Sequence, residues 1–265
     1  MAFTTGGNGI KSVYLESPKS NKIFLYSGKE NSTISHISKV SNDVLLFDEC
    51  SYPEGCFIKK LEINTKQTKS LNLGRLPSYV PSHKKYFFYN SFPNGENWLS
   101  MASLDDFENA IKIAKEPKPK KLPNGINLPL AVPVIQISTD EIIFVGEDEG
   151  LWSYNIRNKN LQSLNIYNCR PILWREKTKQ LLCFDQQWDT FLLKISDQEK
   201  VELQKLKETY GHVYLPFSDS LIYGRTKSNF LFGESYDIYL FSFQNEKEKK
   251  ILKNSHIANG VWTEN

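Results

Sequence analysis

Apolar and polar positions along this chain repeat in one short unit. In each copy a polar turn leads into a strand of mostly apolar and aromatic residues, and a stretch with alternating apolar residues follows. The last aromatic residues of five copies are separated by 42, 55, 40 and 39 residues. The repeat predicts an all-β protein built from copies of one antiparallel unit. The five copies end at Phe47, Tyr89, Phe144, Phe184 and Tyr223.

A period of about 40 residues is typical of the four-stranded blades of a β-propeller. The apolar strand of each repeat then corresponds to the second strand of a blade, B, in an order that runs from A at the centre to D at the rim. Third strands are predicted to begin near Cys56, Trp98, Gly150, Asp189 and Tyr236, and a polar turn leads from each to a last strand. The 55-residue step contains an insertion at residues 116–125, whose three prolines and Asn-Gly pair predict a semi-extended surface loop.

The two ends of the chain complete the pattern. Residues 256–262 are typical of an A strand with no B strand after it, whereas residues 10–15 and 22–26 are typical of B and C strands with no A strand before them. Joined, they predict a sixth blade, and this pairing would remove exposed sheet edges. We therefore expect one domain, residues 1–265, with an all-β fold: a six-bladed β-propeller closed by pairing of N- and C-terminal strands in one blade.

This pattern resembles the six-bladed propellers of the TolB-like and WD40-like families over essentially the whole chain. Two departures are visible. No blade contains the Gly-His and Trp-Asp pair of the WD40 repeat, and the Asp-Gly turn of TolB-like blades is present only in degenerate forms such as residues 82–85. The resemblance implies the fold, whereas function has to be argued from particular residues.

Composition and charge narrow the classes of function. Aromatic residues make up 13% of the 265 residues, enough for a sizeable core, and the net charge of +3 gives no support for direct binding to nucleic acid. The first nine residues lack the features of a secretory signal, and no apolar run is long enough to cross a membrane. We therefore expect a cytoplasmic protein that binds neither nucleic acid nor a membrane, with its four cysteines as free thiols rather than disulfides.

The sequence contains no phosphate-binding glycine loop, no nucleophile elbow and no cysteine-rich zinc spacing. His36, His212 and His256 fall near the predicted starts of A strands in three consecutive blades, so their imidazoles could meet at one mouth of the channel. Certain propeller polysaccharide lyases hold a metal in this general manner, which makes a metal-assisted carbohydrate lyase or hydrolase the alternative function. The simpler interpretation is that these histidines cap a hydrated channel, and we expect no cofactor, no bound metal and no catalysis.

The loops that join B strands to C strands provide the strongest functional signal. In an up-and-down blade these loops emerge on one face, which we call the B–C face. Four of them contain nine carboxylates, three aromatic residues and neither Lys nor Arg. Carboxylates accelerate the capture of a basic protein and aromatic side chains provide buried anchors, although the lysine-rich insertion should offset part of the charge. The predicted partner-binding residues are Asp48, Glu49, Tyr52, Glu54, Phe92, Glu96, Glu147, Asp148, Glu149, Asp185, Trp188 and Asp189.

Together these features predict a non-catalytic, cytoplasmic, protein-binding propeller that forms a heterodimer with one basic protein. In this logic the chain is similar to the immunity proteins of bacterial contact-dependent growth inhibition systems. The partner would then be a basic nuclease toxin, neutralised because the propeller occludes its active site. An acidic surface suits this role, since it would mimic the charge of the toxin's RNA substrate.

Overall fold

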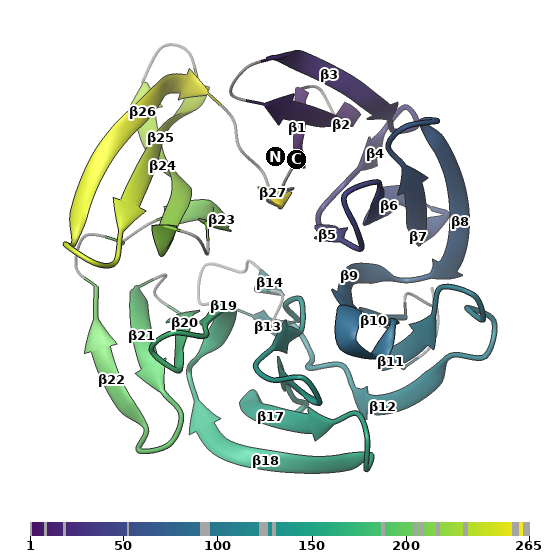
Figure 1. Cartoon of the computed structure of the whole chain (residues 1–265), viewed down its shortest axis with the longest axis vertical. Helices are drawn as coiled ribbons and strands as arrows, with labels where there is room; N and C mark the ends of the chain where they lie inside the picture. Colours follow the sequence, from purple (N-terminus) through teal and green to yellow (C-terminus); the bar gives the residue numbers. More distant parts are fainter. Residues whose placement is uncertain are drawn as a thin grey trace.

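The sheets of this protein stand side by side around a central axis, with the innermost strand of each near the axis and the outermost strand at the rim (Figure 1). A short 3-10 turn, η1 (Pro81–His83), precedes β10 (Lys85–Tyr89), and no helix among the described residues is long and apolar enough to span a bilayer. The architecture is therefore an all-β propeller. The computed structural model describes residues 2–7, 10–17, 20–51, 53–90, 96–121, 127–128, 131–186, 189–203, 206, 209–215, 218–229, 233–255 and 260–261.

Five of the sheets have four antiparallel strands each. The predicted apolar B strands lie second from the axis in these sheets, as the repeat indicates, except in the sheet that contains the chain ends. From the innermost strand to the outermost, the sheet at the chain ends contains β27 (Gly260–Val261), β1 (Ala2–Gly7), β2 (Ile10–Ser17) and β3 (Ser20–Ser27), and the next four-stranded sheet along the chain contains β9 (Arg75–Val80), β10 (Lys85–Tyr89), β11 (Trp98–Ser103) and β12 (Ile111–Lys115). The third contains β15 (Ile135–Gln136), β16 (Glu141–Val145), β17 (Gly150–Asn155) and β18 (Asn160–Tyr167), and the fourth contains β19 (Arg170–Arg175), β20 (Gln180–Phe184), β21 (Thr190–Lys194) and β22 (Glu199–Glu202). The fifth contains β23 (Thr209–Leu215), β24 (Ser220–Asn229), β25 (Gly233–Ser242) and β26 (Lys247–Ser255).

One further sheet has five strands, because its innermost position is divided in two. Both β4 (Ser32–Thr33) and β5 (Ile37–Lys39) pair with β6 (Val44–Ser51), and β7 (Gly55–Glu62) and β8 (Gln67–Leu73) continue the sheet outward. Between β4 and β5, backbone N–H groups bond to the Asp48 side chain in place of a neighbouring strand. The prediction of four strands in each blade is therefore wrong for this sheet, since a side-chain acceptor leaves no mark on the apolar pattern.

The sheet at the chain ends differs from the expected assignment by one strand. β27 pairs with β1 through Ala2 opposite Val261 and Phe3 opposite Gly260, so strands from both ends lie in one sheet. Residues 10–15 and 22–26, predicted as B and C strands, belong to β2 and β3, the third and fourth positions. The pattern missed β1 because residues 4–7 read Thr-Thr-Gly-Gly, without an apolar run. Part of the expected A strand, residues 256–259 and 262, lies outside the described residues.

The insertion after β12 forms a short hairpin near the axis of the disc (Figure 1). Its strands are β13 (Lys120–Lys121) and β14 (Asn127–Leu128), paired through Lys120 opposite Leu128. The sequence predicted a semi-extended loop here, whereas the structure shows that two short segments of the insertion pair with each other. Because β12 runs toward the B–C face, the insertion begins on that face, as the sequence predicted.

The core consists of apolar layers between neighbouring sheets. Phe87 and Phe144, from two B strands, are completely buried in one layer between the β9–β12 and β15–β18 sheets. Leu181 and Phe191 lie in the next layer, between the β15–β18 and β19–β22 sheets. Burial of one such side chain stabilises the fold by about 1.5–3 kcal/mol. Packing between sheets therefore positions the loops on the two faces of the disc.

All four cysteines are paired, which corrects the expectation of free thiols. The Cys50–Cys56 disulfide joins β6 to β7, where the two residues are opposite each other in the strand register. The Cys169–Cys183 disulfide joins the residue before β19 to β20. Free thiols were expected because the protein was predicted to be cytoplasmic. The pairing of neighbouring strands brings the sulfur atoms of each pair together.

Candidate functional site

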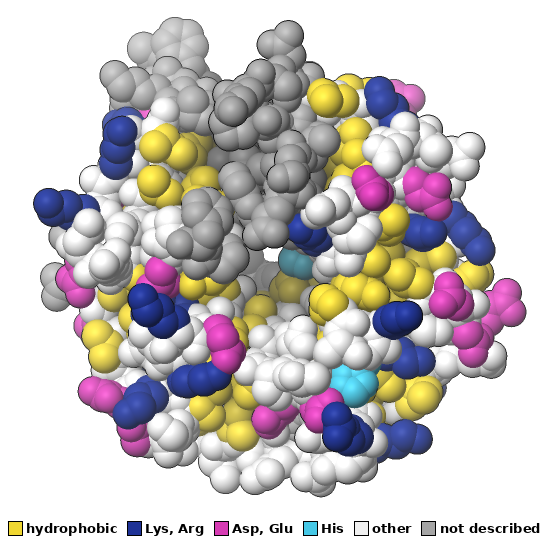
Figure 2. All heavy atoms as spheres, in the orientation of Figure 1, with side chains coloured by type: hydrophobic (Ala, Val, Ile, Leu, Met, Phe, Trp, Pro, Cys, Tyr) yellow, Lys and Arg dark blue, Asp and Glu magenta, His cyan; other side chains and the backbone are white. Residues whose placement is uncertain are grey.

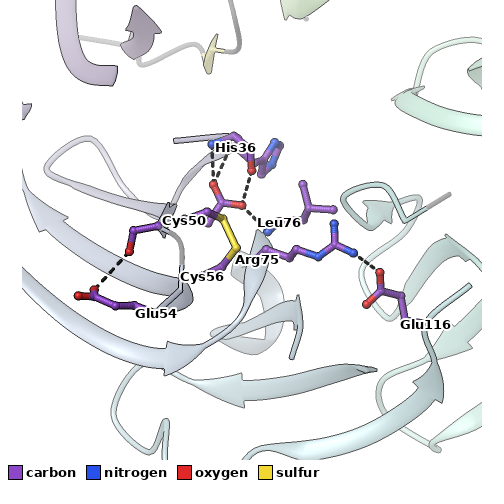
Figure 3. The surroundings of a disulfide bond; sticks show 10 residues. His36, Cys50, Glu54, Cys56, Arg75, Leu76 and Glu116 are labelled. Atoms are coloured by element: carbon purple, nitrogen blue, oxygen red, sulfur yellow. Dashed lines mark hydrogen bonds and ion pairs between the residues drawn. A yellow bond between two sulfur atoms is a disulfide. The ribbon is translucent and has the colours of Figure 1, made fainter. Parts of the chain in front are cut away.

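Asp48, predicted as a partner contact, is an interior residue. Its carboxylate accepts hydrogen bonds from the backbone N–H groups of Ser35 (2.9 Å), His36 (2.8 Å) and Leu76 (2.8 Å), and its side chain is completely buried. The residues it joins, His36 between β4 and β5 and Leu76 in β9, lie close together in Figure 3. Asp48 therefore links two sheets and cannot contact a partner, which corrects the prediction.

Glu49 is also interior, with 4% of its surface exposed. It accepts hydrogen bonds from the Lys29 N–H (2.6 Å), the Tyr26 hydroxyl (2.9 Å) and the Ser32 hydroxyl (2.8 Å), and it forms an ion pair with Lys59. Burial by itself raises the pKa of Glu49, but the hydrogen bonds from Lys59, Lys29 and Ser32 outweigh it and lower the pKa overall. Glu49 is a satisfied buried anion, and its prediction as a contact residue is wrong.

The exposed carboxylates of the B–C face are partly neutralised by lysines from neighbouring segments. Glu54 forms an ion pair with Lys29 at 2.8 Å, and Glu96 forms one with Lys115 at 2.9 Å. Glu147 is exposed, in the turn between β16 and β17. The loops themselves lack basic residues, as predicted, but folding brings lysines beside them. The B–C face is consequently mixed in charge rather than uniformly acidic.

Two further predicted carboxylates, Asp148 and Asp185, stabilise their own turns. Asp148 accepts a hydrogen bond from the Trp152 indole N–H at 2.8 Å, and Asp185 accepts one from the Asp189 backbone N–H at 3.0 Å. Glu149 is half-buried and has a positive φ of 65°. These residues are held by local contacts, which limits what they offer a partner. The predicted aromatic contacts lie outside the described residues: Tyr52, Phe92 and Trp188.

Charges of both signs are also interspersed on the face shown in Figure 2, where Lys and Arg side chains alternate with Asp and Glu. Among the turns opposite the B–C loops, Arg157 pairs with Asp140 at 3.2 Å and Arg175 pairs with Asp219 at 2.5 Å. The described residues therefore do not divide into one acidic face and one basic face. Pairing within each face cancels part of its charge.

Two of the predicted residues, Glu96 and Glu147, do meet in one groove on the B–C face. This groove has a volume of about 560 Å³ and lies between the β9–β12 sheet and the turn that follows β16. We call it the Glu116 groove. It is lined by Arg75, Glu96, Asn97, Lys115, Glu116, Pro117, Lys118, Pro119 and Glu147.

A buried ion pair lies at the floor of the Glu116 groove. Arg75 is the first residue of β9 and Glu116 follows the last residue of β12, so strand direction brings both to the same end of the sheet, where their side chains pair (Figure 3). The side chain of Glu116 is 7% exposed, and its Oε2 atom is buried without a hydrogen-bond partner. Burial raises the pKa of Glu116, and Arg75 opposes this shift. The Asn97 side chain also donates to this carboxyl group, so the acceptor left for a further donor group is the Oε2 atom.

Gly74 explains how β9 can begin so close to its neighbour. A Cβ atom at this position would lie 2.8 Å from the Tyr89 carbonyl oxygen and 2.5 Å from the Phe88 ring. Only glycine permits this approach of backbone to backbone. The sequence at Gly74 thereby fixes where Arg75 starts and which way it points into the groove.

Two of the three predicted channel histidines can be placed. His36 lies beside β5 and His212 lies in β23, and both of these innermost strands contact β27. Burial lowers the pKa of His36 to about 4, against an opposing effect of Asp48, and burial lowers the pKa of His212 to about 4. Both rings are therefore neutral at pH 7. His256 lies outside the described residues, and no group of three metal-binding side chains occurs among the described ones.

Sequence reasoning missed Arg75, Glu116 and Arg170, the charged residues that are most deeply placed around the grooves. A single charge at the edge of a strand has no periodic pattern, and its partner lies about 40 residues away in the case of Arg75 and Glu116. One signal was available for Glu116, which begins the insertion. A signal was also available for Arg75, because a glycine, Gly74, comes directly before it at the start of a strand.

No protein-family model and no curated protein matches the chain. Among solved structures, TolB from Acinetobacter baumannii is similar over 98% of this chain, with a TM-score of 0.69 and 11% identity, and the chain spans 66% of that protein's length. The putative TolB from Agrobacterium tumefaciens is similar over 92% of this chain and 90% of its own, with a TM-score of 0.58 and 8% identity. An oligogalacturonate lyase in complex with manganese is similar over 94% of this chain and 72% of its own, with a TM-score of 0.52 and 12% identity.

The fold and these similarities define the class of protein: an all-β propeller. More particularly, the chain has the TolB-like β-propeller fold. At identities this low the similarity establishes the fold alone, so activity and partners have to be argued from the chain's own residues.

Proposed function

We propose that this chain is a non-catalytic, protein-binding propeller whose partner docks on the B–C face at the Glu116 groove. The observation that carries the proposal is the buried Glu116 Oε2 atom, which lines a groove of about 560 Å³ and has no hydrogen-bond partner. An unsatisfied buried acceptor costs about 1–3 kcal/mol, and a bound donor would recover that free energy.

The chemistry of the groove favours a basic segment of a protein as the occupant. The Glu116 Oε2 atom accepts, and Glu147 is the exposed carboxylate of the lining that has no ion pair within the described part of the chain. Arg75 and Lys115 pair with Glu116 and Glu96, and Lys118 also lines the groove, so the charges of the lining balance overall and the unsatisfied acceptor is what favours a donor. A Lys or Arg side chain supplies donors on a stem long enough to reach a buried acceptor. Pro117 and Pro119 form one wall, and their restricted backbone provides a surface that loses little entropy on binding.

The narrower version, an immunity protein that neutralises a nuclease toxin, depends on a face that repels nucleic acid and attracts a strongly basic protein. Lys29 and Lys115 pair with the acids of that face and Lys118 lines the groove, which weakens the mimicry of RNA by charge. We therefore propose a basic protein partner in a one-to-one complex and leave the toxin version as a subordinate hypothesis. A nuclease captured by the chain and inhibited by it would revive that version.

Charge reversal at the groove rim tests the docking proposal. The immobilised intact chain should capture a basic protein from its native host, and Glu147→Lys should weaken that complex about tenfold, corresponding to about 1.4 kcal/mol. Glu108→Lys is the matched control, because Glu108 is equally exposed but lies in the loop between β11 and β12, away from the groove. Binding that is unchanged by Glu147→Lys, or equally weakened by Glu108→Lys, would contradict the proposal.

The alternative function, a metal-assisted carbohydrate lyase or hydrolase at the channel mouth, has one favourable observation. His36 and His212 are neutral, and both lie at innermost strands next to β27. Titration of the intact protein with manganese discriminates between the functions. Our proposal expects no stoichiometric binding, whereas one bound ion that is lost on His212→Ala would favour the enzyme.

The location of the protein is a separate proposal. The first residues led us to expect the cytoplasm, whereas two disulfides are typical of an oxidising compartment. Alkylation of thiols in intact cells before lysis tests this directly. Four alkylated cysteines would support the cytoplasm, and four protected ones would support an oxidising compartment.

A further inference from the structure

A second groove runs along the seam between the β15–β18 and β19–β22 sheets, separate from the residues that line the Glu116 groove. It has a volume of about 510 Å³, which is in the range of small-molecule sites. Tyr167 of β18 lines it with 53% of its surface exposed, and Phe191 of β21 lies at its buried side. We call it the Tyr167 groove.

The polar residues of the Tyr167 groove are mainly primary amides. Each amide has a carbonyl acceptor and an N–H donor and adds no net charge. Two of them bond to each other, because Gln186 Nε2 donates to Asn168 Oδ1 at 3.2 Å. One carboxylate, Asp185, and one ammonium group, Lys200, also line the groove, so their charges balance. The Lys200 ammonium lies over the Phe191 ring at 4.2 Å. The amides belong to Asn165, Asn168, Gln186 and Gln198.

The position of Tyr167 is set by Gly150 on the neighbouring strand. A Cβ atom at Gly150 would approach the Tyr167 ring to 3.0 Å, so the missing side chain leaves room for the ring beside the backbone. An exposed aromatic ring fixed in this way is a preorganised stacking surface. Two χ angles are all that must be held, so little entropy is lost when a ligand stacks on it.

The groove adjoins a much smaller cavity that contains a buried arginine. Asn168, Asp185 and Gln186 line both spaces, and the small cavity adds Arg170 and Glu149. Arg170 is 5% exposed, and its Nη2 atom is buried without a hydrogen-bond partner. The guanidinium lies 5.4 Å from the centre of the Phe184 ring. An unpartnered cationic donor thus lies at the inner end of the Tyr167 groove.

The size and charge of this cavity select one kind of ligand group. Its volume of about 10 Å³ holds one water-sized group. A carboxylate or phosphate is too large and would be repelled by Glu149 and Asp185, whereas an ammonium group would be repelled by Arg170. A hydroxyl fits, because it is as small as water, neutral, able to accept from the guanidinium and able to donate to a carboxylate.

We propose that the Tyr167 groove binds a neutral oligosaccharide, one sugar ring stacked on Tyr167 and one hydroxyl inserted beside Arg170. The amide side chains bond to the remaining hydroxyls of the sugar. A hydroxyl group and a primary amide group can each donate one hydrogen bond and accept another, so the two are complementary. Peptides match this groove less well, since they offer no water-sized neutral hydroxyl at regular intervals. The inference goes beyond protein binding and does not depend on the Glu116 groove.

Titration of the intact chain with maltotriose, cellotriose and tri-N-acetylchitotriose tests this proposal, followed by calorimetry and by saturation-transfer NMR. At least one of these neutral trisaccharides should bind. Tyr167→Ala should raise its dissociation constant about tenfold, and Asn168→Ala about fivefold, because stacking and one hydrogen bond are lost. Both residues are exposed, so circular dichroism should show an unchanged fold.

Two comparisons make the result decisive. Glu108→Lys, in the exposed loop between β11 and β12, should leave saccharide binding unchanged. A galacturonate trisaccharide should bind no better than the neutral ones, because the charges of Glu149 and Asp185 balance those of Arg170 and Lys200. The proposal is overturned if none of the three neutral trisaccharides binds at about 10 mM. It is equally overturned if Tyr167→Ala has no effect, or if the acidic trisaccharide binds best.

Discussion

At the scale of single residues, the buried carboxylates of this propeller replace missing strand contacts. Asp48 fills the gap between β4 and β5 by accepting from Ser35 and His36, and it accepts from Leu76 of the next sheet. A carboxylate with this many donors is satisfied although it is fully buried. Residues that the sequence presents as loop charges therefore act as structural links between sheets.

Asp48→Ala should lower the free energy of unfolding by about 3–5 kcal/mol, because three buried N–H groups lose their acceptor. Urea unfolding followed by fluorescence measures this change. Glu147→Ala is the control, since Glu147 is exposed and its removal should change the unfolding free energy by about 0.5 kcal/mol or less. A loss below about 1 kcal/mol for Asp48→Ala would contradict the role of this carboxylate.

The buried histidines should make stability depend on pH. Burial lowers the pKa of His36 to about 4, with Asp48 opposing, and that of His212 to about 4. The unfolded chain, with histidine pKa values of about 6.5, binds more protons between these limits, so the stability present at pH 7 falls as the pH drops from 6.5 toward 4. Both residues keep part of their surface exposed, which reduces the expected loss to about 1–2 kcal/mol.

Unfolding curves of the wild type and of His36→Gln/His212→Gln at pH 7 and pH 4.5 isolate this effect from that of the carboxylates. The double variant should lose less stability over this interval than the wild type. Equal losses in both proteins would show that the two histidines do not carry the pH dependence.

At the scale of elements, strands with a local apolar pattern could be predicted and strands defined by distant contacts could not. The B strands β6, β10, β16, β20 and β24 are short buried runs, so the sequence alone identified them. β1 was missed because four of its six residues, residues 4–7, are Thr or Gly and form no apolar run. The division of β4 from β5 depends on Asp48, which lies more than ten residues further along the chain. Contacts between residues far apart in the sequence define these strands, and a local pattern in a single sequence does not reveal such contacts.

The two disulfides should stabilise their sheets to different degrees. Cys169–Cys183 spans 14 residues and Cys50–Cys56 spans 6, and the entropy removed from the unfolded chain grows with the closed loop. Cys169→Ala/Cys183→Ala should therefore cost about 3 kcal/mol, and Cys50→Ala/Cys56→Ala slightly less. Thermal unfolding with and without a reductant measures both. Four reactive thiols in the denatured, unreduced protein would contradict the pairing.

At the scale of the whole molecule, folding brings opposite charges together and creates grooves at the seams between sheets. The sequence predicted Glu96 and Glu147 on one face, and they do line one groove, but Lys115 and Lys118 line it too. Pooling the loops by topology found part of the candidate site. The rest, above all the floor built by Arg75 and Glu116, depends on the ends of β9 and β12 lying together, which only the folded sheet defines.

Hydrogen–deuterium exchange of the intact chain, alone and in complex with its captured partner, tests the central claim most directly. If the partner occupies the Glu116 groove, the amides of residues 96, 97, 115, 116, 118 and 147 should exchange more slowly in the complex, whereas the opposite turn at residues 157–160 should be unaffected. Protection confined to that turn or to the Tyr167 groove, with no change around Glu116, would contradict the proposed docking site.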